Sequence, residues 1–238
     1  MLLLIALCAP GVTHAQMTLT VNDGTTTDSY VPFYSYYADL GTNSQFLISS
    51  SDLSDMIGGE ITELRFYAST VSATWSSNRW EIYLTEISGN SLSTATFDDW
   101  TTMTQVYEGA LSLTNNEMQI VFDDGYTYNG GSLLIGFHET TNGSCPSVSW
   151  YGVASTNMSR KQYYSYSSSY EGFSPKVTFT YTPGSSCERP SDLAAANITT
   201  TTADLSWTAG AVGLFNVQYS TDNENWTSVS VAGMEILT

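Results

Sequence analysis

Tyrosines are concentrated in two stretches of the sequence, which are its clearest candidates for ligand recognition. The aromatic residues of these stretches are Tyr30, Phe33, Tyr34, Tyr36 and Tyr37 near the start, and Tyr163, Tyr164, Tyr166 and Tyr170 within residues 162–170. Tyrosine provides rigid, amphipathic contact area at low entropic cost, and the serines around it adapt their hydrogen bonds. We therefore expect Tyr163, Tyr164, Tyr166 and Tyr170 to stack on a ligand such as a sugar ring. The alternative is that the aromatics cover the ends and edges of the fold.

Three tryptophans lie in or beside stretches with the composition of loops, namely Trp75, Trp100 and Trp150. An exposed indole offers the same kind of flat apolar face as tyrosine, with a polar N–H at its edge. We expect Trp100 and Trp150 to contribute to the same ligand site, with asparagine and serine side chains supplying hydrogen bonds.

Two acidic runs are candidates for a metal ion, namely Asp98-Asp99 and Asp123-Asp124-Gly125. Calcium takes about six to eight oxygen ligands, which loops supply from carboxylates and backbone carbonyls. Neither run has the spaced Asp-x-Asp-x-Asp ladder of a dedicated calcium loop, so the alternative is that these acids only form turns. We expect no cofactor, with a structural calcium ion as the open alternative.

Few residues have the types that catalysis requires. His138 is the only histidine after residue 15, and neither a Gly-x-Ser-x-Gly motif nor a catalytic-cysteine signature accompanies it. Glu81, Glu86, Glu108 and Glu139 could supply the paired acids of glycoside hydrolysis, which stand about 5–10 Å apart. With 23 acidic residues in the chain, however, some pair will approach by chance. We therefore expect a protein that is not an enzyme.

Residues 1–15 have the features of a signal peptide. The apolar run Leu2–Leu7 is too short to span a bilayer. Thr13 and Ala15 place small residues at positions −3 and −1 of a cleavage site, although basic residues are missing from the start of the segment. We expect cleavage after Ala15 and a secreted or cell-surface protein. The alternative is lipid attachment at Cys8.

Two cysteines remain in the predicted mature chain, Cys145 and Cys187. Disulfides persist in the oxidising compartments that a signal peptide implies. A bridge between these residues would tie the predicted linker to the first domain, but sequence alone does not show that their Cα atoms approach closely enough. Both the bridged and the unbridged forms stay open.

The charge balance narrows the class of partner. Six Lys and Arg residues oppose 23 Asp and Glu residues, giving a net charge of −17. Nucleic acids and anionic membrane surfaces bind clustered cations, so neither is an expected partner. Hydrophobic residues make up 42% of the chain, which is enough for a packed core. No stretch after residue 15 is apolar enough to span a membrane.

Apolar and polar residues alternate along many segments of residues 16–182. Leu64 and Phe66 alternate with polar neighbours, and Leu133, Ile135 and Phe137 follow the same period of two. Glycine- and asparagine-rich turns separate these segments. Strands with one apolar face need a second sheet to cover it. The sequence therefore predicts an all-β, antiparallel, jelly-roll-like β-sandwich of about eight to ten strands.

A linker at residues 183–190, Pro-Gly-Ser-Ser-Cys-Glu-Arg-Pro, separates this domain from residues 191–238. In the second region the pattern Ala-x-Leu-x-Trp ends at Trp207, and Phe-x-Val-x-Tyr ends at Tyr219. This pattern resembles the first half of a fibronectin type III domain, which implies an immunoglobulin-like β-sandwich. The second half of that family, with its Leu-x-Pro-x-Thr-x-Tyr corner, is not present before Thr238, so the resemblance implies an incomplete domain.

The combination of sandwich, Gly-Ser-Ser-Cys-x-x-Pro linker and fibronectin-like region is similar to secreted surface proteins of Bacteroidetes, and Tyr30-Val-Pro-Phe-Tyr34 adds to that similarity. It implies an adhesin-like or carbohydrate-binding first domain. We predict a non-catalytic adhesion or binding module for a glycan or a host or matrix protein, with the fibronectin-like region as spacer. One alternative is the accessory N-terminal region of a larger secreted hydrolase, a glycosidase or peptidase, whose catalytic unit lies beyond Thr238. Another is a purely structural surface protein.

Overall fold

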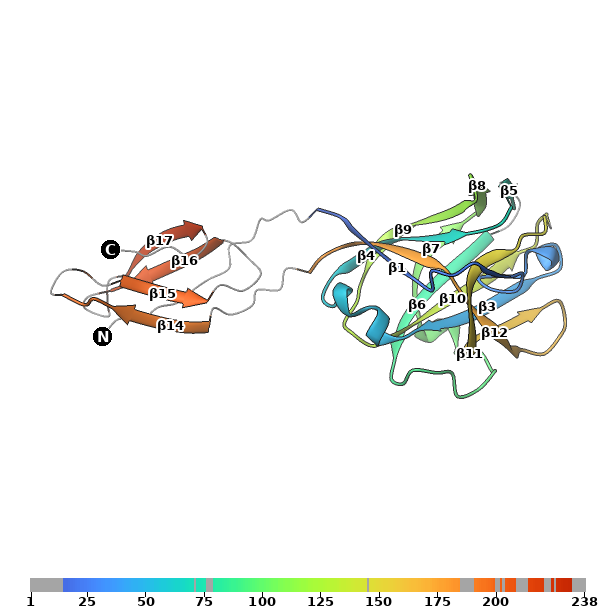
Figure 1. Ribbon diagram of the computed structural model, residues 1–238. Coiled ribbons are helices and arrows are strands. Elements are labelled where there is room, and N and C mark those ends of the chain that lie inside the picture. The colour runs from blue at the N-terminus through green and yellow to red at the C-terminus, as the bar shows by residue number, and fades with distance from the viewer. Residues whose placement is uncertain are drawn as a thin grey trace. The chain divides into compact units, whose positions relative to one another are not determined.

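The computed structural model (Figure 1) describes residues 15–70, 72–75, 79–144, 146–184, 191–199, 202, 204–208, 214–220, 224 and 226–232. The chain divides into two compact units between Gly184 and Ser185, and each unit is described by itself below. The predicted signal segment up to residue 14, residues 185–190 of the predicted linker, and both cysteines of the predicted disulfide, Cys145 and Cys187, lie outside the described residues.

The first unit, residues 15–184, is built from β-strands and short 3-10 turns. Its strands are β1 (Met17–Val21), β2 (Thr26–Asp28), β3 (Thr42–Ile48), β4 (Glu60–Tyr67), β5 (Ser72–Thr74), β6 (Arg79–Ile87), β7 (Thr104–Gly109), β8 (Ser112–Thr114), β9 (Glu117–Thr127), β10 (Ser132–Thr141), β11 (Trp150–Tyr163), β12 (Ser169–Pro175) and β13 (Val177–Thr182). Its 3-10 turns are η1 (Ser35–Tyr37), η2 (Ser50–Asp52), η3 (Ser54–Met56) and η4 (Trp100–Thr102).

These strands form two antiparallel sheets. One has the order β1-β13-β4-β9-β8-β5, and the other has the order β12-β11-β3-β10-β6-β7, with the short strand β2 added beside β11. Every pairing between named strands in the described part of the chain is antiparallel. The prediction of an all-β, antiparallel fold is confirmed.

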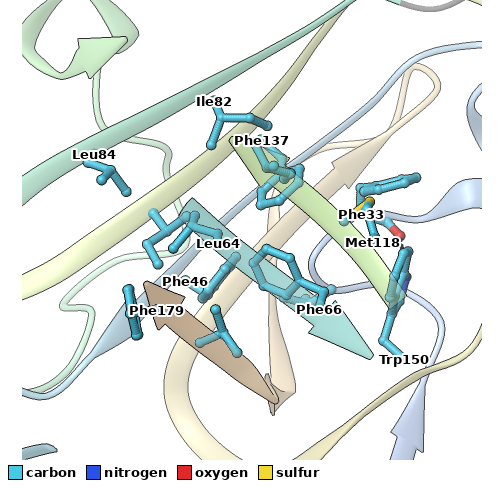
Figure 2. Packing of buried hydrophobic residues seen from close by; sticks show 14 of the residues in the cluster. Phe33, Phe46, Leu64, Phe66, Ile82, Leu84, Met118, Phe137, Trp150 and Phe179 are labelled. Atoms are coloured by element: carbon cyan, nitrogen blue, oxygen red, sulfur yellow. Dashed lines mark hydrogen bonds between the residues drawn. The ribbon is translucent and has the colours of Figure 1, made fainter. Parts of the chain in front are cut away.

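A single apolar core lies between the two sheets (Figure 2). Phe66 on β4 meets Phe46 on β3 and Phe137 on β10, with ring centroids 5.9 and 5.4 Å apart and near-perpendicular rings. Such edge-to-face contacts suit the quadrupoles of aromatic rings. All three side chains are fully buried, as the period-two pattern predicts for the inner face of each strand. The two sheets therefore pack face to face as a β-sandwich.

The outer face of the seven-stranded sheet is also partly covered. Residues 88–103 pass over it, and Leu92 and Met103 pack with Leu47 and Leu134 in a second, smaller apolar cluster. Arg160 on β11 is 1% exposed and holds this segment in place. Its guanidinium donates hydrogen bonds to the side chains of Gln45 and Asp98 and to the backbone carbonyls of Thr94 and Thr96. Because both faces of β10 are covered, its run Leu133–Ile135 is buried throughout.

The second unit contains two antiparallel strand pairs in its described residues. β14 (Ser191–Ala196) pairs with β15 (Asp204–Thr208), and β16 (Leu214–Tyr219) pairs with β17 (Thr227–Ala232). Leu205 and Trp207 on β15 are buried, in agreement with the alternation of the Ala-x-Leu-x-Trp pattern. Across the described residues of both units, no helix has the length and apolarity needed to cross a bilayer.

Candidate ligand-binding site

Phe33 anchors the first tyrosine stretch to the apolar core. Phe33 is fully buried, and its ring packs against Trp75, Trp80 and Trp150 with centroid distances of 5.0, 4.3 and 5.3 Å. The indole Nε1 of Trp150 donates a hydrogen bond of 3.2 Å to the carbonyl oxygen of Phe33. Tyr34 is half-buried beside this anchor, and the 3-10 turn η1 follows it.

The second tyrosine stretch begins at the end of β11 and continues into the turn before β12. Pairing of β11 with β3 places Tyr163 opposite Thr42. The N–H of Tyr164 donates to the carbonyl oxygen of Gly41 at 2.8 Å, and the N–H of Tyr166 donates to that of Tyr163 at 3.1 Å. Tyr164 has a φ of 52°, a left-handed conformation that reverses the chain here. Strand pairing thus brings the two stretches together.

Seven tyrosines from the two stretches form a continuous set of ring contacts, which we call the tyrosine cluster. Its members are Tyr30, Tyr34, Tyr36, Tyr37, Tyr163, Tyr164 and Tyr166. Tyr34 and Tyr163 are joined directly, with ring centroids 5.0 Å apart. Tyr36, Tyr164 and Tyr166 are 55%, 52% and 56% exposed. Large aromatic side chains at this level of exposure form a surface suited to binding.

A polar hollow of about 420 Å³ adjoins the cluster and is called here the Asp28 hollow. Its lining residues are Thr27, Asp28, Ser29, Tyr30, Tyr34, Tyr36, Ser147 and Ser149. Ser29 Oγ lies 3.1 Å from Ser149 Oγ, and the N–H of Val148, between Ser147 and Ser149, donates to Ser35 Oγ at 2.9 Å. The size falls within the range of about 300–1,000 Å³ typical of small-molecule sites.

The carboxylates of Asp28 and Glu171 and the ammonium group of Lys161 set the electrostatics at and beside the hollow. The Nζ of Lys161 lies 3.1 Å from the centroid of the Tyr30 ring and also pairs with Glu171. Burial raises the pKa of Asp28, although hydrogen bonds from the backbone N–H groups of Tyr30 and Val31 oppose that rise. Burial likewise raises the pKa of Tyr34, so its phenol stays neutral at ordinary pH and presents an O–H group.

Three of the six predicted ligand residues lie in the cluster, namely Tyr163, Tyr164 and Tyr166. Tyr170 shows no ring contact with the cluster within the described residues, and its hydroxyl donates to the carbonyl of Leu92 at 3.1 Å. The expectation for Trp150 is corrected, because this side chain is fully buried in the core (Figure 2) and has no face free for a ligand.

Trp100 is half-buried on the outer face of the seven-stranded sheet. Its indole stacks on His138 with a centroid distance of 4.9 Å and also contacts Tyr83 and Phe97. It passes over Gly136, where any Cβ atom would lie 2.4 Å from the indole. None of its ring contacts is with the tyrosine cluster as far as the chain is described, so Trp100 is assigned to the covering of this face rather than to the candidate site.

The acidic runs considered for calcium have other partners. Asp98 forms an ion pair of 2.7 Å with Arg160, and Asp99 accepts hydrogen bonds from the backbone and side chain of Thr101, which lower its pKa. Asp123 Oδ2 accepts a hydrogen bond of 3.2 Å from the N–H of Glu108, and Asp124 is exposed. Among the described residues, no group of three or more His, Cys, Asp or Glu side chains is arranged to hold a metal ion. Asp98 therefore has an ion-pair role and Asp99 caps the 3-10 turn η4, whereas Asp123 and Asp124 lie within strand β9.

The residues weighed for catalysis also have local partners. Glu81 accepts hydrogen bonds from Tyr83 at 2.7 Å and from Nδ1 of His138 at 3.1 Å when that nitrogen carries a proton. Glu108 pairs with Arg79. Glu86 accepts hydrogen bonds from the backbone N–H groups of Asn129 and Gly131. Glu139 accepts one of 2.8 Å from the backbone N–H of Thr42.

The polar half of the candidate site was not among the residues predicted from the sequence. Tyr30, Tyr34 and Tyr36 were recognised in the first tyrosine stretch, but Asp28, Ser147 and Ser149 were not predicted as site residues. The available signal was weak, since Asp28 precedes a serine as many turn acids do, and two serines flanking a buried valine are common in a strand-rich chain.

Comparison with protein-family models finds no match for this chain, and comparison with curated proteins finds no relative.

Proposed function

We propose that residues 15–184 form a non-catalytic binding module that recognises a carbohydrate at the tyrosine cluster and the Asp28 hollow. The observation that carries this proposal is the meeting of two tyrosine stretches, more than 120 residues apart in sequence, beside a hollow that the first of them lines together with serine and threonine hydroxyl groups. A sugar has apolar ring faces and polar edges. Rings and hydroxyl groups in one place match both halves of that chemistry.

The fixed positions of the tyrosine rings also support carbohydrate binding. Tyr34 touches four other tyrosine rings, so its position depends on the cluster rather than on one contact. Aromatic side chains held in this way lose little further entropy on binding, which favours affinity. The predicted signal peptide places the module outside the cell or on its surface, with the fibronectin-like region as a spacer.

A glycan array tests the proposal with the full chain and the double variant Tyr164→Ala/Tyr166→Ala. We expect the wild type to bind a defined set of glycans and the double variant to lose at least tenfold in affinity, because two exposed rings are removed. Tyr170→Ala serves as the matched control, since it removes a 37% exposed tyrosine outside the cluster. Circular dichroism confirms that each variant is folded.

Unchanged glycan binding by the folded double variant would contradict the assignment of the site. The wild type could also bind no glycan on the array but bind an extracellular protein through the same surface. That result would show that the partner is a protein rather than a carbohydrate.

A further inference from the structure

Only one of the two carboxylate oxygens of Asp28 accepts hydrogen bonds from the described part of the protein. Its Oδ1 atom accepts hydrogen bonds from the N–H groups of Tyr30 at 2.7 Å and Val31 at 3.3 Å. Its Oδ2 atom has no hydrogen-bond partner in the part of the chain that the structure describes, and Asp28 lines the hollow. The backbone thus orients this side chain and leaves acceptor capacity for a ligand, since each carboxylate oxygen accepts about two hydrogen bonds.

The other charges near the hollow balance each other. Lys161 pairs with Glu171, and both side chains are largely buried, at 13% and 18% exposed. The same ammonium covers one face of the Tyr30 ring. The remaining lining residues carry hydroxyl groups only. Asp28 therefore supplies the uncompensated negative charge of the hollow, in a chain whose net charge is −17.

Building on the proposed function, we propose that this site selects uncharged sugars with two adjacent free hydroxyl groups and rejects acidic sugars. Two neighbouring hydroxyl groups of the ligand donate to Oδ2 of Asp28, and the rings of Tyr34 and Tyr36 contact its apolar face. Ser29, Ser147 and Ser149 donate to, or accept from, its other oxygens. A uronic acid or sulfated sugar brings a second anion beside Asp28, and like charges at close range in a partly buried site repel strongly.

Titration calorimetry with matched glycan pairs tests this selection. The neutral member of each pair, such as a glucose or galactose oligosaccharide, is compared with the corresponding uronic-acid oligosaccharide at the same ionic strength. We expect the wild type to bind the neutral member at least tenfold more tightly. The preference should shrink as salt rises from 20 to 500 mM, because salt screens the repulsion; the Debye length falls below about 8 Å above 0.15 M.

The variant Asp28→Asn tests the effect of the negative charge while keeping a side chain of nearly the same shape. Asparagine keeps an oxygen for the N–H groups of Tyr30 and Val31 but removes the negative charge. We expect it to lose at least fivefold in affinity for the neutral sugar and to narrow the neutral-to-acidic preference to less than threefold. Asp124→Asn, which removes an exposed acid elsewhere, should leave both quantities unchanged.

The outcomes distinguish this inference from the proposed function. Equal or tighter binding of the acidic sugar by the wild type, with loss of binding in Tyr164→Ala/Tyr166→Ala, overturns the charge selection and leaves the carbohydrate site standing. An Asp28→Asn variant that is folded and unaltered in affinity and preference overturns the role of Asp28. If the wild type binds no sugar of either kind, both proposals are wrong.

Discussion

The backbone N–H of Tyr164 donates a 2.8 Å hydrogen bond to the carbonyl oxygen of Gly41, and this bond joins the two tyrosine stretches of the candidate site. Gly41 has a φ of +102°, a conformation that side chains with a Cβ atom rarely adopt. The bond therefore depends on glycine at position 41, because the carbonyl direction follows from this backbone conformation.

Replacing Gly41 by alanine is expected to destabilise the fold by about 1–3 kcal/mol and to weaken glycan binding, since the strained backbone shifts the carbonyl that receives Tyr164. Urea unfolding measures the first effect, titration calorimetry with a glycan measures the second, and near-UV circular dichroism reports the packing of the tyrosines. Gly58→Ala is the control, because Gly58 also has a positive φ of 76° but is not part of the cluster. Equal changes in tyrosine dichroism for both variants would argue against a specific role for Gly41.

Lys161→Met is expected to lower stability by roughly 2 kcal/mol, because it removes both the cation over Tyr30 and the partner of Glu171. It should also raise the pKa of Asp28 further, since the Lys161 charge lowers that pKa. Urea unfolding and carboxyl NMR titration measure the two effects. The double variant Lys161→Met/Glu171→Gln should recover part of the stability, because no unpaired buried charge remains. A double variant less stable than Lys161→Met would contradict this account.

Arg160→Met is expected to cost roughly 3–5 kcal/mol, because Asp98, Gln45 and two backbone carbonyls lose a buried donor. Residues 88–103 should then become the first site of limited proteolysis. Asp98→Asn is the comparison, and it should cost less than Arg160→Met, since the asparagine oxygen can still accept a hydrogen bond from the buried guanidinium and the other acceptors keep their donor. Proteolysis that begins elsewhere in both variants would rule out Arg160 as the anchor of this segment.

Because Glu139 is buried, we expect the free energy of unfolding to fall as the pH rises. Burial raises its pKa to about 8 from 4.5, against the lowering effect of the hydrogen bond from Thr42. A folded-state pKa above the unfolded value means that the stabilising contribution is complete below about pH 4.5 and is lost as the pH rises through 8. We expect a loss on the order of a few kcal/mol over this window.

Thermal or urea unfolding from pH 4.5 to 9 measures this dependence, with Glu139→Gln as the paired variant. The glutamine side chain has a similar shape and does not titrate, so its stability should vary less with pH over the same range. Parallel curves for the two proteins would show that other groups cause the change.

The sequence was sufficient to predict the strands, but it did not show for every residue whether the side chain points into the core. Period-two alternation identified Leu64 and Phe66 as core residues because each strand buries one face. Trp150 was expected to reach a ligand because it lies in or beside a loop-like stretch, whereas it begins β11 and its side chain is fully buried in the core. Local patterns do not show which way the first residue of a strand points.

The aromatic residues of the candidate site could be predicted from the sequence, but its polar residues could not. A run of tyrosines departs from ordinary composition, so Tyr164 and Tyr166 were recognisable without a fold. The contacts of the neighbouring Tyr163 with Tyr34 and Tyr37 depend on the pairing of β11 with β3, which spans more than 100 residues of sequence. Asp28 resembles an ordinary turn acid in the sequence, and its place in the site depends on the pairing of β2 with β11, which sets it opposite Trp150.

The pairing of β1 with β13 has a practical consequence. Met17 lies opposite Tyr181, so the chain enters and leaves the first unit side by side at one edge of the six-stranded sheet. The Asp28 hollow is built from β2 and from the segments that precede β3 and β11. Neighbouring entry and exit points let a domain be spliced into a surface loop of an unrelated carrier. Residues 15–184 are thus suited to insertion into a carrier as one unit, and the proposed binding site would be transferred with them.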